Sequence, residues 1–201
     1  MGMTAQMLDI WYADAPMAAW STPIFDNAKR LAASGNKQDT ALALHEILNS
    51  DGLGSILRLQ AWNGLREMGY APGSEIEKEL CGVIIEVGMD EGLDVLAGYA
   101  DGSARYLNYS GKLIVYEGGP GPVAARAAAL IEACEPIVQR IGVWEQPRPA
   151  SPGTGAMRLS MLTPNGLYFG QASMGALSGD PMAGPAVQAG VALMSALIDL
   201  K

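Results

Sequence analysis

The spacing of apolar positions along the chain changes at about residue 80. Between residues 23 and 70, apolar side chains recur three and four positions apart, as they do in helices that bury one face. Leu44, Ile47 and Leu48 show this spacing, and a second run with the same period follows after a Gly-containing break. This part of the chain predicts three short helices.

From Cys81 onward the apolar positions alternate with other positions, which is the two-residue period of strands. Short segments that contain glycine separate the alternating runs, at Asp90–Gly92, Asp101–Gly102 and Ser110–Gly111. Such segments are typical of hairpin turns. Four strands joined by three tight turns predict an antiparallel meander.

The remainder of the chain predicts two more helices and a second hairpin. The run "VAARAAALIEACEPIVQRIG" consists mostly of strong helix formers, and Pro136 is expected to kink or divide that helix. Residues 146–156 are rich in Pro, Gly and Ser and predict a linker or mobile loop. Two alternating runs around "PNG" predict the hairpin, and a final helix is expected after Asp180 with Pro181 in its first turn.

The predicted order of elements is ααα-ββββ-α-ββ-α, an α+β fold in which helices pack on an antiparallel sheet. Residues 1–22 are apolar and aromatic without a clear period, so they predict an irregular N-terminal arm. Residues 23–201 are expected to form a single domain, with a helical part at 23–70 and the sheet with its helices at 80–201.

The predicted turns also set the register of the meander and therefore the two faces of the sheet. They pair Tyr99 with Ala104 and Asn108 with Leu113. One face is then apolar almost throughout and requires a covering layer of helices. The opposite face is mixed and consists of Ile84, Glu86, Asp94, Leu96, Gly98, Arg105, Leu107, Tyr109, Lys112, Ile114 and Tyr116.

Polar and aromatic residues of the mixed face are the candidate binding residues, namely Glu86, Asp94, Arg105, Tyr109, Lys112 and Tyr116. One interpretation is a half-solvated face on which Glu86 reaches Arg105 across the gap at Gly98, a type of pair that contributes about 0.2–1 kcal/mol. The other interpretation is a binding face centred on Arg105 and Tyr109, residue types that often anchor interfaces. Glu86 and Asp94 are also a candidate carboxylate pair for acid–base chemistry.

The charge of the chain argues against polyanionic partners. It contains 13 basic and 21 acidic residues, a formal net charge of −8, and no cluster of Lys or Arg. Nucleic acids and anionic membranes attract clustered positive charge, so neither is an expected partner. The stretch Pro181–Ile198 carries no charge, but Pro185, Gln188 and many small residues favour a buried helix over a membrane span.

Residue types that perform catalysis or bind metals are sparse. His45 is the only histidine, and the chain contains no G-x-S-x-G, Walker or dinucleotide-binding motif. Cys81 and Cys134 lie far apart in apolar surroundings, which favours two buried, reduced thiols in a cytoplasmic protein over a disulfide or a zinc site. We therefore expect no catalytic residue, no metal and no cofactor.

These observations predict a non-catalytic, soluble module that binds a protein partner or a second copy of itself as a homodimer. The aromatic side chains of residues 1–22 need a covering surface, and the last predicted helix is apolar on all sides. The alternative is a small-molecule-binding sensor or enzyme with a pocket on the mixed face of the sheet.

Overall fold

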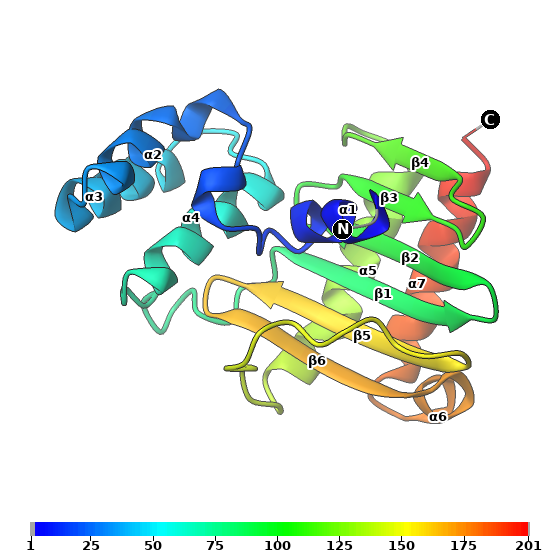
Figure 1. Cartoon of the computed structure of the whole chain (residues 1–201). Coiled ribbons are helices and arrows are strands. Elements are labelled where there is room, and N and C mark those ends of the chain that lie inside the picture. The colour runs from blue at the N-terminus through cyan, green and yellow to red at the C-terminus, as the bar shows by residue number, and fades with distance from the viewer. Residues whose placement is uncertain (1–2, 201) are drawn as a thin grey trace.

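The protein is built on a six-stranded antiparallel sheet with helices on both of its faces (Figure 1). A computed structural model describes residues 3–200, and its strands have the order β4-β3-β2-β1-β5-β6. The strands are β1 (Gly82–Met89), β2 (Gly92–Tyr99), β3 (Ala104–Leu107), β4 (Leu113–Tyr116), β5 (Ala156–Thr163) and β6 (Gly166–Ser173). The α+β class and the four-stranded meander followed by a hairpin are confirmed.

The helices form three groups around this sheet. They are α1 (Met3–Trp11), α2 (Asp26–Ala33), α3 (Lys37–Leu48), α4 (Ser55–Glu67), α5 (Pro122–Val138), α6 (Met174–Gly179) and α7 (Gly184–Ile198), with short 3-10 turns η1 (Met17–Ala19) and η2 (Pro23–Phe25). In Figure 1, α5 and α7 lie behind the sheet, α1 lies in front of it, and α2–α4 stand beside it.

The face of the sheet that carries α5 and α7, here called the α5/α7 face, holds the largest apolar core among the described residues. Val83 and Leu96 of the sheet are buried there with Leu130 of α5 and Leu193 of α7. Each large apolar side chain buried in this way contributes about 1.5–3 kcal/mol. Gly98 allows the close approach of α7, because a Cβ atom at this position would lie 2.8 Å from Leu193 Cδ2.

Helix α1 and the loop between α5 and β5 cover the opposite face, here called the α1 face. Leu8, Trp11 and Tyr12 are buried in a core that includes Ile84 of β1. The Tyr99 hydroxyl donates a hydrogen bond to the Trp11 carbonyl oxygen at 2.8 Å. The N-terminal arm is therefore not irregular throughout. Its helix was not predicted because the three buried positions span little more than one turn, which is too short to show a helical period.

The helical part at 23–70 forms a core of its own beside the sheet. Trp20 and Phe25, with ring centroids 4.7 Å apart, are buried with Leu44 of α3 and with Trp62 and Leu65 of α4. The three helices predicted for this part of the chain are confirmed.

Two details of the last helices differ from the predictions. Helix α5 is not divided at Pro136, because this residue lies in the last turn and removes only one hydrogen-bond donor there. Helix α7 has Pro185, and not Pro181, in its first turn, and the preceding loop contains the short α6. Among residues 3–200, no helix is both long enough and apolar enough to cross a membrane.

The register of the meander differs by one residue from the prediction at each turn. The first turn is one residue shorter than predicted, since Gly92 already pairs with Met89. The second and third turns are one residue longer. The Tyr99 N–H donates to the Ser103 carbonyl, and an equivalent bond closes the turn between β3 and β4.

The side chains of two turn residues explain the longer turns. Asp101 accepts hydrogen bonds from the N–H and hydroxyl of Ser103, and Asn108 accepts from N–H groups of the following turn. Gly102 and Gly111, with φ of 80° and 86°, take the left-handed position that ends a three-residue loop. Because a slip of one residue exchanges the faces of a strand, the predicted apolar and mixed faces each combine residues from both real faces.

We predict that Gly88→Ala destabilises the protein by about 1–3 kcal/mol, because a Cβ atom there would overlap the carbonyl oxygen of Gly153. The loop before β5 crosses β1 at this point, and the Gly155 N–H donates to the Gly88 carbonyl at 2.9 Å. Gly170→Ala is the matched control, since no atom lies within 4 Å of a Cβ atom at that strand position. Urea unfolding measures both variants, and equal stabilities would contradict the packing of this loop against β1.

Candidate functional site

A cleft of about 700 Å³ opens between the helical part and the α1 face of the sheet. Four segments line it, namely the N-terminal arm, α4, residues 143–148 and the turn between β5 and β6. A cleft of this size is in the range that holds small organic molecules. We call it the polar cleft because two arginines, two aspartates and Glu145 contribute to its lining.

A buried ion pair lies beneath the polar cleft. Glu86 of β1 and Arg158 of β5 are direct cross-strand neighbours, and Arg158 Nε donates to Glu86 Oε2 at 2.8 Å. Neither side chain has any solvent exposure. The hydroxyl of Tyr12, which lines the cleft, donates to the same Glu86 oxygen at 2.7 Å and lies 2.9 Å from Ser160 Oγ.

The remaining groups of the ion pair bind the loop before β5. Arg158 donates to the carbonyl oxygens of Pro149 and Ala150 at 3.1 and 2.9 Å, and the Ser151 hydroxyl donates to Glu86 Oε1 at 3.0 Å. We call residues 146–155 the strap. The sequence predicted a linker or mobile loop here, and the structure fixes the strap over the sheet through these hydrogen bonds.

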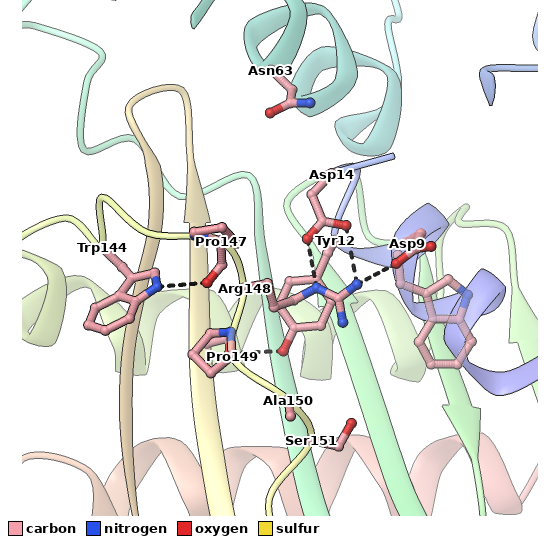
Figure 2. A network of polar contacts seen from close by, with 12 residues as sticks. Asp9, Tyr12, Asp14, Asn63, Trp144, Pro147, Arg148, Pro149, Ala150 and Ser151 are labelled. Carbon is pink, nitrogen blue, oxygen red and sulfur yellow. Dashed lines mark hydrogen bonds and ion pairs between the residues drawn. The ribbon is translucent and has the colours of Figure 1, made fainter. Parts of the chain in front are cut away.

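Arg148 of the strap joins it to the N-terminal arm (Figure 2). Its guanidinium lies 4.5 Å from the centroid of the Tyr12 ring and forms ion pairs with Asp14 at 2.6 Å and Asp9 at 2.5 Å. Burial raises the pKa of Asp14 above its ordinary value, although the bonds from Arg148 oppose this shift. Burial and the nearby Glu86 carboxylate likewise raise the pKa of Tyr12, so its hydroxyl remains a donor.

Arg66 of α4 is the second cation of the polar cleft. It donates to the Pro164 carbonyl at 2.5 Å and to Asn63 Oδ1 at 3.2 Å, and both acceptors are neutral. None of the ion pairs found among residues 3–200 involves Arg66. Burial lowers the pKa of this guanidinium, although the nearby Glu67 carboxylate opposes this shift.

The structure does not bring the six sequence-predicted site residues together. Glu86 and Arg105 lie on the α1 face, but Glu86 pairs with Arg158, and Arg105 pairs with Glu117 at 3.2 Å. The predicted contact between Glu86 and Arg105 is therefore wrong. Its cause is that β5 flanks β1 on the side opposite β2 and supplies a closer arginine.

The other four residues lie on or beside the α5/α7 face and in the turn between β3 and β4. Asp94 accepts hydrogen bonds from the Tyr106 hydroxyl at 3.1 Å and from the Tyr109 N–H at 2.6 Å. Tyr116 donates to the Gly119 carbonyl. Lys112 is exposed. The carboxylates of Asp94 and Glu86 point to opposite faces of the sheet, so these two residues do not form the predicted carboxylate pair.

Sequence reasoning missed the residues that build the polar cleft. Arg158 carried a usable signal, since it is a lone charge in an otherwise apolar strand, as is Glu86. Two lone opposite charges in apolar strands indicate a buried pair. Arg66, Arg148 and Asp14 carried no such signal, because they come from helical and loop segments that meet only in the folded chain.

The residue types of hydrolytic or redox catalysis lie elsewhere. His45 stands on α3 between the rings of Trp62 and Tyr70, with centroids 6.1 and 6.4 Å away. Cys81 and Cys134 are free and buried, and burial raises the pKa of each thiol to about 12. In the part of the chain that the structure describes, no three His, Cys, Asp or Glu side chains meet as a metal site.

We predict that Glu86→Gln lowers the free energy of unfolding by about 3–5 kcal/mol, because it leaves the Arg158 charge buried without a counterion. Glu117→Gln is the control, since it removes the exposed partner of Arg105 and is expected to cost less than about 1 kcal/mol. Chemical denaturation at neutral pH measures both variants. A cost at Glu86 as small as that at Glu117 would contradict the role given to the buried pair.

No protein-family model, curated protein or solved structure matches this chain.

Proposed function

We propose that this chain is a non-catalytic binding protein that takes a small zwitterion, such as an amino acid or a short peptide, in the polar cleft. One observation carries the proposal: charges of opposite sign are left without full compensation on different segments that line the same cleft. A zwitterion complements both charges at once.

The positive charge is that of Arg66. Its guanidinium lines the cleft, is partly desolvated, and has only neutral acceptors as partners. Arginine binds carboxylates with two parallel, charge-assisted hydrogen bonds. A ligand carboxylate at this position would supply the counterion that Arg66 lacks.

The negative charge comes from Glu145 and from the cluster of Asp9, Asp14 and Arg148. Two carboxylates share one guanidinium, so the cluster carries a net charge of −1 when both acids are ionised. Burial already disfavours the ionised form of Asp14, as its raised pKa shows. An ammonium group next to Asp14 would reduce this cost.

Apolar side chains also line the cleft. Leu59, Leu162 and Leu167 line the cleft together with the ring of Trp144, which packs edge to face on Phe169 with centroids 5.1 Å apart. The Trp144 indole donates to the Pro147 carbonyl and is thereby held in place. Such a surface suits the apolar side chain of an amino acid or dipeptide.

Calorimetric titration with leucyl-leucine and two matched analogues tests the proposal. N-acetyl-leucyl-leucine lacks the ammonium and leucyl-leucine amide lacks the carboxylate. We expect each analogue to bind at least about tenfold more weakly than the dipeptide, because a charged hydrogen bond contributes about 1.5–3 kcal/mol.

Variants then test whether Arg66 binds the carboxylate of the ligand. Arg66→Gln is expected to weaken the binding of leucyl-leucine at least about tenfold and to leave the already weak binding of leucyl-leucine amide unchanged. Arg126→Gln on the exposed side of α5 is the control. Equal affinity for all three ligands would contradict the proposal, and so would an unchanged affinity of Arg66→Gln for leucyl-leucine. A protein that binds neither leucyl-leucine nor any of the twenty free amino acids would also contradict it.

We propose self-association through strand β4 as a second function. Leu113 and Val115 of this edge strand are 45% and 42% exposed. The Asn108 N–H donates to the Lys112 carbonyl oxygen, and in an antiparallel pair every second residue bonds the neighbouring strand. The backbone N–H and C=O groups of Ile114 therefore point to β3. Those of Leu113 and Val115 point to the free edge. Such an edge readily pairs with another strand.

A second copy fits this edge with a two-fold axis at Ile114. Leu113 of each copy then lies opposite Val115 of the other, on the same face of the joined sheet, and their four free backbone groups form hydrogen bonds. The four exposed side chains of the two copies would shield one another from water. This arrangement is isologous and closes, so it predicts a dimer and no larger assembly.

Native mass spectrometry at low micromolar concentration tests the dimer. We expect Val115→Lys to convert it to a monomer, because two lysines would then face apolar partners across the axis. Leu42→Lys is the control, since Leu42 is 55% exposed on α3, outside the sheet. A monomeric parent protein, or a dimer that survives Val115→Lys, would rule out pairing through β4.

A further inference from the structure

We infer that the cavity between the α5/α7 face and helix α7 binds an amphipathic amine, that is, an alkyl or arylalkyl chain with a terminal ammonium. This site is separate from the polar cleft, since it lies on the other face of the sheet. The cavity has a volume of about 240 Å³. That volume corresponds to about eight groups of the size of a water molecule, at roughly 30 Å³ each.

The lining of the cavity is apolar except at one point. Strands β1, β2, β3 and β5 and helices α6 and α7 contribute to it. Four methionines line it, Met89, Met157, Met174 and Met194. Methionine side chains are unbranched and adaptable, so surfaces rich in them accept apolar groups of different shape.

The mouth of the cavity keeps apolar surface in contact with water. Val191 of α7 is 53% exposed and Met174 of α6 is 41% exposed, and both belong to the lining. Gly190 keeps the backbone of α7 close to the sheet, because a Cβ atom at this position would collide with Ile85 Cδ1. An apolar chain that enters would remove the exposed surface of the mouth from water.

Asp94 selects the charge of the ligand. It is the only acid among the lining residues, and no lining residue is basic. Its carboxylate accepts hydrogen bonds from the Tyr106 hydroxyl and the Tyr109 N–H, one at each oxygen. A carboxylate has about four acceptor sites, so Asp94 retains free lone pairs for an ammonium group.

The hydrogen-bond partners of Asp94 are neutral groups. Burial and the adjacent carboxylate raise the pKa of Tyr106 to about 12, so this phenol stays neutral and acts as a donor. No ion pair of Asp94 occurs among residues 3–200. A fatty acid would bring a second negative charge to the same point, so the charge of Asp94 favours an amine over a carboxylate ligand.

Methionine-methyl NMR of the whole chain tests this inference with octylamine as the probe. The chain contains 11 methionines, of which four line the cavity. We expect saturable shifts at Met89, Met157, Met174 and Met194 and none at Met68, which belongs to the helical core. Octylamine should bind about tenfold more tightly than octanol, and octanol more tightly than octanoate.

Two variants separate the charge from the cavity. Asp94→Asn keeps an acceptor for the Tyr109 N–H and is expected to reduce octylamine affinity to that of octanol. Val191→Lys adds a positive charge at the exposed mouth and should weaken the binding of octylamine and strengthen the binding of octanoate. Ala128→Lys adds the same charge on the exposed side of α5 and is the control.

Three outcomes would overturn the inference. If octanoate bound as tightly as octylamine, Asp94 would not select the charge of the ligand. Shifts spread evenly over all the methionines would indicate a detergent effect without a site. Absence of saturable shifts with octylamine would show that the cavity does not take this class of ligand. Because none of these measurements involves Arg66 or leucyl-leucine, they are independent of the test of the polar cleft.

Discussion

The ion pair of Glu86 and Arg158 is the constraint on which the whole α1 face depends. Both charges lie at the centre of the sheet without solvent exposure, where a charge that loses its partner costs several kcal/mol. Each charge therefore needs further hydrogen bonds, and these come from Tyr12 of the arm and from the Pro149 and Ala150 carbonyls of the strap. The arm and the strap stay on the sheet because they complete the surroundings of this pair.

The same pair restricts how the β5–β6 hairpin docks on the meander. Glu86 and Arg158 are 72 positions apart in the chain and directly opposite in the sheet. A slip of one residue would turn Arg158 into the apolar α5/α7 core and leave both charges buried and unpaired. With this register fixed, the turn between β5 and β6 lies across from α4 and Arg66 bonds the Pro164 carbonyl, which closes one side of the polar cleft.

Local patterns in the sequence predict the elements well and their contacts poorly. The change of period near residue 80 and the Gly-containing turns were sufficient for the α+β class, the four-stranded meander and the second hairpin, but not for the position of that hairpin beside β1. The register was not predictable from the turns alone, because the Asp101 and Asn108 side chains lengthen two of them. Glu86 was recognised as a candidate but given the wrong arginine, since no local pattern tells which strand flanks β1 on its other side.

Each of the two candidate sites contains a charged side chain whose hydrogen-bond partners are neutral. The Glu86–Arg158 pair is buried and fully bonded, and the Arg148 and Arg105 guanidiniums also meet carboxylates. Arg66 and Asp94 instead line a cleft and a cavity with only neutral partners. Burying a charge beside neutral partners costs free energy, and buried groups with a shifted pKa, such as Arg66, cluster at functional sites. The opposite signs of these two charges, in sites on opposite sides of one sheet, therefore predict two ligands of different chemistry.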